Sequence, residues 1–469
     1  MRWVVATVLV FLVGASALVI AGAPPERSAA VGPGVAGFSG APATPALVDP
    51  AGLGEHLDAL ARIARESGGD RAAGTIGDRR SRAYVAARLR AAGWRVREHP
   101  VRAGAFEERA APRLGLGDAP LRPRDDVRSL GYSGAGEVAG HLHVVGVRLG
   151  RERASGCRRS DFRALPRGDV ALVQRGVCTF RRKVEHAQAA GAAAVLVVND
   201  GRPGRTAAPT GTLGSPPVAI PALGVGTRTG AELLRAGARI VRVRVNARSE
   251  VLRTANVIAE LPGGPPGRVV MAGAHLDSVP AGPGLNDNGS GVATLLEVAE
   301  GLGARGAPAG ARIRLAFWGA EEVGLVGSRR YVRGLASAER RAIAAYLNLD
   351  MVGSPNAVPA IYRGEDARSR RIERILRTAA EREGPVDSEE IGGRSDHAPF
   401  AAAGVPVGGL YTGAEERKTE RQAREHGGRA GRALDPCYHE ACDRRSNVDE
   451  RLLARMARAA GAALLVLTR

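Results

Sequence analysis

The sequence predicts an α/β protein with a mixed, largely parallel sheet flanked by helices and interrupted by a β-rich insert. Short apolar runs bounded by Gly and Pro alternate with helical patterns, which is typical of buried parallel strands. Three such runs end on acidic or imidazole side chains, at residues 269–274, 312–318 and 344–349. From about residue 106 to 248 the pattern changes to short Val-rich strands separated by turns, which indicates a separate insert.

The first residues have the pattern of an export signal. Arg2 precedes an uncharged apolar run over residues 3–20, and a stretch rich in Pro, Ala and Gly follows. We assign residues 1–30 to a signal peptide and the aperiodic residues 31–50 to a flexible linker. The chain would then be secreted. Because the apolar run is near the ~18 residues that can span a bilayer, a membrane anchor through an uncleaved N-terminal segment is the alternative.

Two amphipathic helices and a strand follow the linker. Leucines at helical spacing predict a helix from Gly52 onward, and residues 78–92 form a second helix with Gly93 as its C-cap. Residues 94–101 alternate like a strand. Outside the insert, the sequence also predicts a strand over 405–410 and helices over 291–302, 324–334, 368–383 and 448–467. Within the insert it predicts strands over 136–147, 168–174 and 240–245 and one helix over 180–190.

The net charge of +19 comes almost wholly from arginine, since lysine occurs only at positions 183 and 418. Nucleic-acid binding needs basic residues clustered on one face and aromatic residues that stack bases. Here the arginines are scattered and aromatic residues make up only 4% of the chain. We therefore expect no nucleic-acid partner.

The four cysteines of an exported chain allow three pairings. Proximity in the sequence favours disulfides between Cys157 and Cys178 and between Cys437 and Cys442. Such bonds are consistent with an oxidising compartment.

Acidic and imidazole side chains follow the three predicted strands where each one ends. His275 and Asp277 follow the first strand, Glu321 and Glu322 the second, and Asp350 the third. Ligands bind at the carboxyl ends of strands in parallel sheets, so these groups would converge. So much negative charge in one crevice favours bound cations.

Two further residues complete a set of metal ligands. Asp287 lies in a Gly-rich loop after the first strand, and His439 lies between Cys437 and Cys442, whose disulfide would fix its ring. Two histidines and three carboxylates, one of them shared, would form two closely spaced four-coordinate zinc sites with room for water. This arrangement is of the hydrolytic di-metal type.

These residues resemble the secreted co-catalytic di-zinc aminopeptidases, zinc metallopeptidases that include bacterial leucine-type enzymes. The resemblance implies the zinc-exopeptidase (phosphorylase/hydrolase-like) fold, with a peptidase domain split between residues 51–105 and 249–469. The motifs that carry it are His-Leu-Asp-Ser at 275–278, Asn-Asp-Asn-Gly at 286–289, Glu-Glu at 321–322, Asn-Leu-Asp-Met at 348–351 and Cys-Tyr-His at 437–439.

The same resemblance gives a role to each metal ligand. His275 and Asp350 would bind one zinc, Glu322 and His439 the second, and Asp287 would bridge both. It also implies a cis peptide between Asp287 and Asn288.

The remaining site residues take their roles from the resemblance as well. Glu321 would be the general base that takes a proton from a water bridging the two metals and passes it to the leaving amine. Tyr438 donates a hydrogen bond to the developing oxyanion. Asp277 orients His275, and Arg394 lies near the amino end of the substrate. Because the set of five ligands is already complete, His397 would either support a ligand without binding metal or have a structural role.

The insert, residues 106–248, resembles the protease-associated (PA) domain. Two runs of sequence carry this resemblance. They are Gly168-Asp169-Val170-Ala171-Leu172-Val173-Gln174-Arg175-Gly176-Val177-Cys178 and, downstream, Val195-Leu196-Val197-Val198-Asn199-Asp200. It implies a small β-rich domain without chemistry of its own.

Together these features predict an exported di-zinc aminopeptidase that removes apolar first residues from peptide or protein N-termini. The alternatives are an inactive receptor or sorting module of the same fold, and a glutaminyl cyclase or carboxypeptidase on the same scaffold. A structural calcium ion is not favoured, because Asp449 and Glu450 are followed by Arg451 and a helix without acidic residues. The oligomeric state is not predicted.

Overall fold

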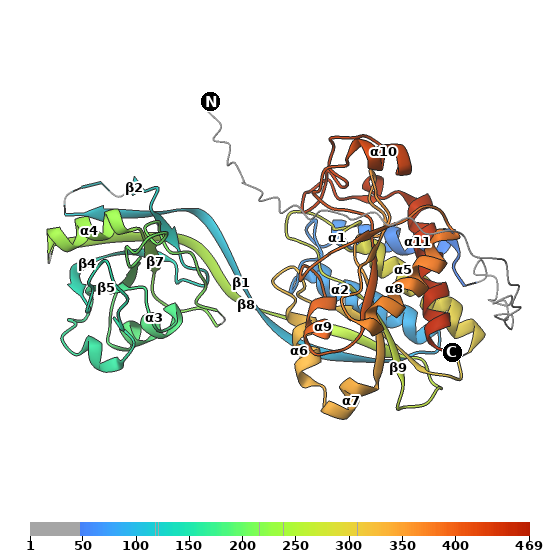
Figure 1. Ribbon diagram of the computed structural model, residues 1–469. Coiled ribbons are helices and arrows are strands. Elements are labelled where there is room, and N and C mark those ends of the chain that lie inside the picture. Colours follow the sequence, from blue (N-terminus) through green and yellow to red (C-terminus); the bar gives the residue numbers. More distant parts are fainter. Residues whose placement is uncertain (1–46, 118, 121, 215, 238, 307) are drawn as a thin grey trace, which may run out of the picture. The chain divides into compact units, whose positions relative to one another are not determined.

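The computed structural model describes residues 47–469, apart from residues 118, 121, 215, 238 and 307 (Figure 1). The predicted signal peptide and almost all of the predicted linker therefore lie outside the described residues. Within the part of the chain that is described, no helix is long and apolar enough to cross a membrane.

The main sheet is mixed and largely parallel, as predicted. Its strand order is β13-β12-β14-β11-β9-β10-β8. Strands β10 and β11 both pair parallel with β9, β14 pairs parallel with β11, and β8 pairs antiparallel with β10. The strands are β8 (Ile240–Glu260), β9 (Val269–His275), β10 (Arg312–Trp318), β11 (Ile343–Leu349), β12 (Ala360–Tyr362), β13 (Asp387–Glu389) and β14 (Val407–Tyr411).

Helices cover both faces of the main sheet, because its central strands are apolar on both sides. Along β9, Val270 and Ala272 belong to a core that includes residues of α1, α2, α5 and α11, while Val269 and Met271 belong to a core that includes residues of α6 and α9. The helices are α1 (Pro50–Arg65), α2 (Ile76–Ala91), α5 (Gly289–Arg305), α6 (Val326–Gly334), α7 (Ser337–Ala342), α8 (Ala367–Glu381), α9 (His397–Ala402), α10 (Glu420–His426) and α11 (Glu450–Leu467).

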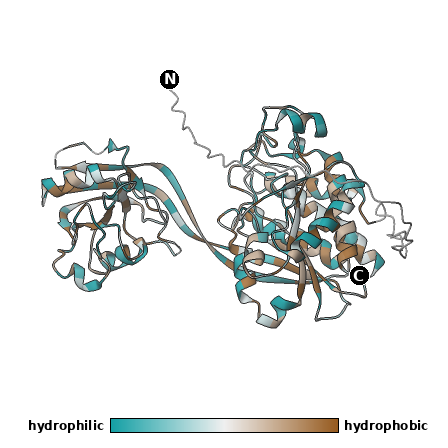
Figure 2. Cartoon of the chain, viewed as in Figure 1, coloured by the Kyte–Doolittle hydropathy of each residue, from teal (hydrophilic) through white to brown (hydrophobic). Residues whose placement is uncertain are grey.

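Hydropathy along these helices agrees with their packing. Hydrophobic and hydrophilic segments alternate along α11, whereas α10 is mainly hydrophilic (Figure 2). In α11, residues such as Leu453, Ala457 and Leu464 are buried, and they recur at the three- to four-residue spacing of one helix face. No residue of α10 is buried.

The start of α5 fixes the loop that carries Asp287. The side chain of Asn288 caps this helix by accepting a hydrogen bond from the Gly291 N–H, and its amide donates to the Leu349 carbonyl oxygen. The peptide between Asp287 and Asn288 is cis. Asp287 is thereby placed between the end of β11 and the first turn of α5.

Two long strands, β1 (Arg95–Leu116) and β8, pair antiparallel from Arg95 and Glu260 to Leu116 and Val241. The predicted strand over 94–101 is thus only the beginning of β1. The predicted domain boundaries near residues 105 and 248 both lie within this ribbon, because the two strands continue unbroken from the main sheet into the insert.

The insert has a core of its own, built around apolar residues of β5, β6 and β7. The predicted helix over 180–190 is present as α3, whereas α4 was not predicted. The cystine of Cys157 and Cys178 lies in this part of the chain, as predicted. The elements are β2 (Arg122–Pro123), β3 (Val127–Ser129), β4 (Gly136–Val144), β5 (Val170–Gln174), α3 (Phe180–Ala189), β6 (Ala194–Val198), β7 (Ala222–Val225) and α4 (Thr227–Ala236).

Candidate active site

The site is built where β9, β10 and β11 end side by side. His275 is the last residue of β9, Glu321 and Glu322 follow β10, and Asp350 follows β11 directly. Because these three strands are parallel neighbours, their carboxyl ends share one edge of the sheet. These residues line one cavity of about 360 Å³ together with Asp287, Tyr438 and His439.

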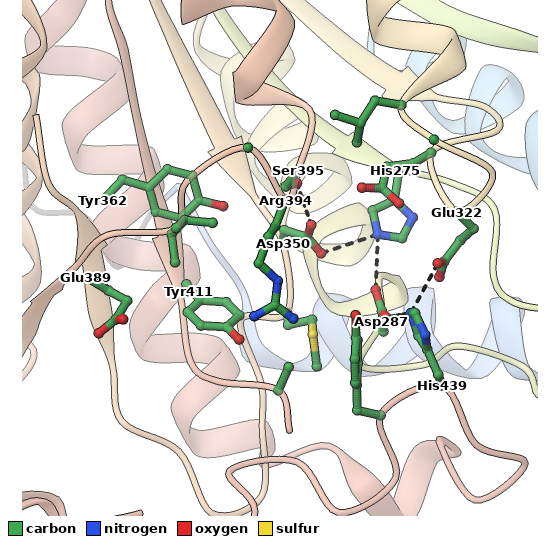
Figure 3. A pocket seen from close by; sticks show the side chains of 18 of the residues that line it. His275, Asp287, Glu322, Asp350, Tyr362, Glu389, Arg394, Ser395, Tyr411 and His439 are labelled. Carbon is green, nitrogen blue, oxygen red and sulfur yellow. Dashed lines mark hydrogen bonds and ion pairs between the residues drawn. The ribbon is translucent and has the colours of Figure 1, made fainter. Parts of the chain in front are cut away.

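The structure brings all five predicted ligands together around Asp287 (Figure 3). Oδ1 of Asp287 lies 3.0 Å from Nε2 of His275, and Oδ2 lies 3.3 Å from Nε2 of His439. His275 Nε2 is also 3.3 Å from Oδ1 of Asp350, and His439 Nε2 is 3.1 Å from Oε2 of Glu322. Each oxygen of Asp287 thus faces a different imidazole, and each imidazole faces one further carboxylate.

The imidazole of His275 has a defined tautomer. Its Nδ1 atom lies 3.0 Å from the main-chain carbonyl oxygen of Asp277. A carbonyl oxygen only accepts hydrogen bonds, so Nδ1 carries the proton and donates it. In the neutral ring, Nε2 then presents a lone pair to the carboxylates of Asp287 and Asp350. Such a contact is favourable only with a cation or a second proton between the groups.

Electrostatics at the site show the same excess of negative charge. Burial raises the pKa of Glu322 to about 7, and Asp287 adds to this rise. Burial also raises the pKa of Glu321 well above its usual value. Burial alone would lower the pKa of His439, but Asp287 and Glu322 outweigh it and raise the value to about 10. Without cations, the site therefore takes up protons to balance its carboxylates.

These residues fit zinc. Imidazole nitrogens and carboxylate oxygens are zinc ligands, and the spacings of 3.0–3.3 Å between them are close to the ~3.4 Å expected between ligands of a tetrahedral ion. In addition, Oε1 of Glu322 is buried without a hydrogen-bond donor among the described residues. A buried carboxylate oxygen without a donor is costly unless a cation binds it.

Asp277 holds the two glutamates through their main chain. Its carboxylate accepts hydrogen bonds from the N–H groups of Glu321 (3.1 Å) and Glu322 (3.3 Å). The ring of His275 is instead held by the Asp277 carbonyl oxygen. We predicted from the sequence that Asp277 orients His275, and the structure adds this second contact with the main chain after β10.

The cystine of Cys437 and Cys442 closes the predicted ring around Tyr438 and His439. His439 has a left-handed backbone conformation, with φ of 60°, and the Tyr438 ring stacks on its imidazole at 3.9 Å between centroids. The segment closed by this disulfide, residues 437–442, thus presents the side chains of Tyr438 and His439 to the cavity.

Three charged residues near the site were not found from the sequence. Asp443 accepts hydrogen bonds from the main-chain N–H groups of Asn286 and Asp287, at 2.8 and 2.9 Å. Arg71 is fully buried and donates to the carbonyl oxygens of Leu276, Pro283 and Gly284, which fixes the loop before Asp287. Asp396 is buried, and burial raises its pKa. Asp443 and Arg71 contact segments that are distant in the sequence, which leaves no local pattern in the sequence.

Arg394 and His397 form hydrogen bonds with residues other than the five metal ligands. Arg394 lines the cavity, but its guanidinium group is held by Glu415 and Glu416 at 2.8 Å. Nε2 of His397 donates to the carbonyl oxygen of Gly392 at 2.6 Å, and the ring is buried.

Comparison with known proteins agrees with this geometry. Residues 256–464 match peptidase family M28, and residues 138–233 match the PA domain. An aminopeptidase of Pseudomonas aeruginosa is 39% identical over 412 residues, which cover 84% of this chain and 76% of that protein. The chain belongs to peptidase family M28.

Two further proteins extend the comparison. A probable lipoprotein aminopeptidase of Mycobacterium tuberculosis, LpqL, is 39% identical over 414 residues, 85% of this chain and 81% of that protein. The crystal structure of a zinc aminopeptidase from Bacillus subtilis, BSAP, superposes with a TM-score of 0.55 at 26% identity, covering 88% of this chain and 94% of that one. The protein is thus an M28 zinc aminopeptidase with an inserted PA domain.

Proposed function

We propose that this M28 aminopeptidase holds two zinc ions that share Asp287. His275 and Asp350 would complete the first site, and Glu322 and His439 the second. The observation that carries the proposal is the position of Asp287, whose two oxygens lie 3.0 and 3.3 Å from two different imidazoles. A carboxylate placed in this way suits a bridge between two metal ions.

Zinc bound here would supply a Lewis acid that polarises the scissile carbonyl and lowers the pKa of water. Glu321 would act as the general base. Its burial and its raised pKa suit a group that takes a proton from the attacking water and passes it to the leaving amine. Its main-chain N–H donates to Asp277, which fixes the backbone from which its side chain extends.

Two further residues would contact the substrate. Tyr438 lines the cavity beside His439, and its phenol would donate a hydrogen bond to the oxyanion. The free α-amine would be recognised by Glu321 and Asp350, whose negative charge suits an ammonium group. Arg394, held by Glu415 and Glu416, would form part of the wall near this end of the substrate.

The substrates would be peptide or protein N-termini, with apolar first residues among the preferred ones. Apolar or aromatic surfaces of Leu325, Met351, Tyr362, Ile391 and Tyr411 line the cavity beside the ligands. They suit an aliphatic side chain that leaves water. Export is supported by the predicted signal and by two disulfide bonds.

The experiment that tests this proposal uses two series of aminoacyl anilides, one with a free and one with an acetylated α-amine. We expect hydrolysis of the free series alone, loss of activity with 1,10-phenanthroline, and recovery with added zinc. Equal turnover of the acetylated series would contradict the aminopeptidase activity. No turnover of either series by zinc-loaded protein would support the inactive module of the same fold.

A further inference from the structure

The cavity extends away from the metal ligands to a region formed by Tyr362, Tyr411 and Glu389 (Figure 3). These residues come from three neighbouring strands at the edge of the main sheet, β12, β14 and β13. Both phenol groups are already hydrogen-bonded: Tyr362 accepts from the Asn348 amide, and Tyr411 donates to Glu416. The two tyrosines therefore offer mainly their aromatic rings to a ligand.

Most charged groups in this region are paired with one another. Arg394 is held by Glu415 and Glu416 at 2.8 Å. Glu390 is paired with Arg363 at 2.7 Å. Arg329, the other arginine of the cavity lining, belongs to α6, which packs against β1, β8 and α9 rather than against β12–β14. Beside β12–β14, Arg363 and Arg394 are thus both paired with glutamates.

Glu389 differs from its neighbours. Its carboxylate has no hydrogen bond or ion pair with any described residue, while its main chain is fixed by pairing with Tyr362 and by the Arg363 N–H, which donates to its carbonyl oxygen. Partial burial and repulsion by Glu416 raise its pKa, although Arg363 partly offsets this. The side chain is exposed to the cavity and is anchored on a strand.

We propose that Glu389 makes the enzyme favour first residues with a cationic tip on an apolar stem, namely lysine or arginine. This inference rests on the proposed function, since it requires the α-amine to lie at Asp350 and Glu321. The stem would pack on Tyr362 and Tyr411, whose rings also attract a cation, and the tip would pair with Glu389. A leucine side chain would still pack on Tyr362 and Tyr411. The preference for cationic first residues therefore adds to the preference for apolar ones.

The test compares substrates with a cationic tip against matched substrates with a neutral one. The kcat/KM values are measured for lysyl and norleucyl anilides and for arginyl and citrullinyl anilides, with wild type, Glu389→Gln and Glu389→Arg. We expect wild type to favour lysine over norleucine. In Glu389→Gln the ratio should fall about three- to tenfold, the size of a partly exposed ion pair, while norleucine is hydrolysed as before. Glu389→Arg should favour norleucine.

Glu390→Gln is the matched control, because Glu390 is adjacent but already paired with Arg363. It should leave the lysine to norleucine ratio within about twofold of wild type. The inference is overturned if Glu389→Gln keeps the wild-type ratio, or if Glu390→Gln lowers it equally. Failure of the wild type to hydrolyse any of the four substrates would instead overturn the proposed function, and this inference with it.

Discussion

The carboxylate of Asp443 accepts a hydrogen bond of 2.9 Å from the main-chain N–H of Asp287, although 156 positions separate them in the sequence. The C-terminal segment thus both carries His439 and holds the backbone of the central carboxylate. In Asp443→Asn, an NH2 group replaces one of the two carboxylate oxygens that accept from the main-chain N–H groups of Asn286 and Asp287. One of these N–H groups then faces a donor. We expect zinc affinity and kcat/KM to fall about 10- to 100-fold.

Glu440→Gln is the control for this variant, since Glu440 lies in the same segment and is exposed. Zinc affinity is measured by competition with a coloured chelator. Wild-type affinity in Asp443→Asn would show that the hydrogen bond does not position Asp287.

The phenol of Tyr438 can be tested by Tyr438→Phe. The ring would still stack on His439, so zinc content should not change. Loss of one donor to the oxyanion should lower kcat by about 100-fold, with a smaller change in KM. Steady-state kinetics on a leucyl anilide give both values. A variant with wild-type kcat would assign Tyr438 a packing function only.

The two disulfides should differ in their effect on metal binding. In the double variant Cys437→Ser and Cys442→Ser, the ring that presents His439 is open, and we expect zinc to dissociate roughly tenfold more readily. The matched variant Cys157→Ser and Cys178→Ser opens a disulfide of the insert, which contributes no metal ligand. Equal zinc loss in both double variants would contradict a specific function of the C-terminal ring.

Burial of His56 predicts a loss of stability in acid. Burial lowers the pKa of this imidazole from 6.5 to about 4. Between these values the unfolded chain binds a proton that the folded chain does not, so the free energy of unfolding falls as the pH falls from 6.5 to 4. At about 1.4 kcal/mol for each unit of pKa, this is on the order of 3 kcal/mol.

In His56→Gln this contribution is absent, because glutamine does not titrate. Urea unfolding at pH 7 and pH 4.5 should therefore show a smaller acid-induced loss of stability in the variant than in wild type. Equal losses in the two proteins would show that His56 is not the group responsible.

The sequence predicts the centre of the fold well and the insert's connection poorly. The strands β9, β10 and β11 were predicted to within about one residue, because buried parallel strands are continuous apolar runs between Gly and Pro. The length of β1 and β8 was not predicted. In the middle of the ribbon, residues 107–110 pair with residues 246–248, and the two segments contain only Glu, Arg, Asn and Ala. These residues have no hydrophobic period that would distinguish a two-stranded ribbon from a loop.

At the site, too, residues in local motifs were predicted from the sequence, whereas residues that act through distant contacts were not. His275 and Glu322 lie in short motifs at strand ends, and Asp287 lies in one just before α5, so local sequence signals their chemistry. Arg71 and Asp443 act only through the main chain of distant segments, so no spacing in the sequence marks them. Glu389 was missed for a related reason: only the pairing of β12 with β13 places it in the cavity.

The central claim is that His275, Asp287, Glu322, Asp350 and His439 hold two zinc ions for a reaction that Glu321 catalyses. It is tested most directly by anomalous diffraction at the zinc edge, combined with the turnover of Glu321→Gln. We expect two zinc peaks flanking Asp287 in both wild type and variant, with kcat of the variant reduced by about 100-fold or more. A single peak, or a Glu321→Gln variant that retains wild-type turnover, would contradict it.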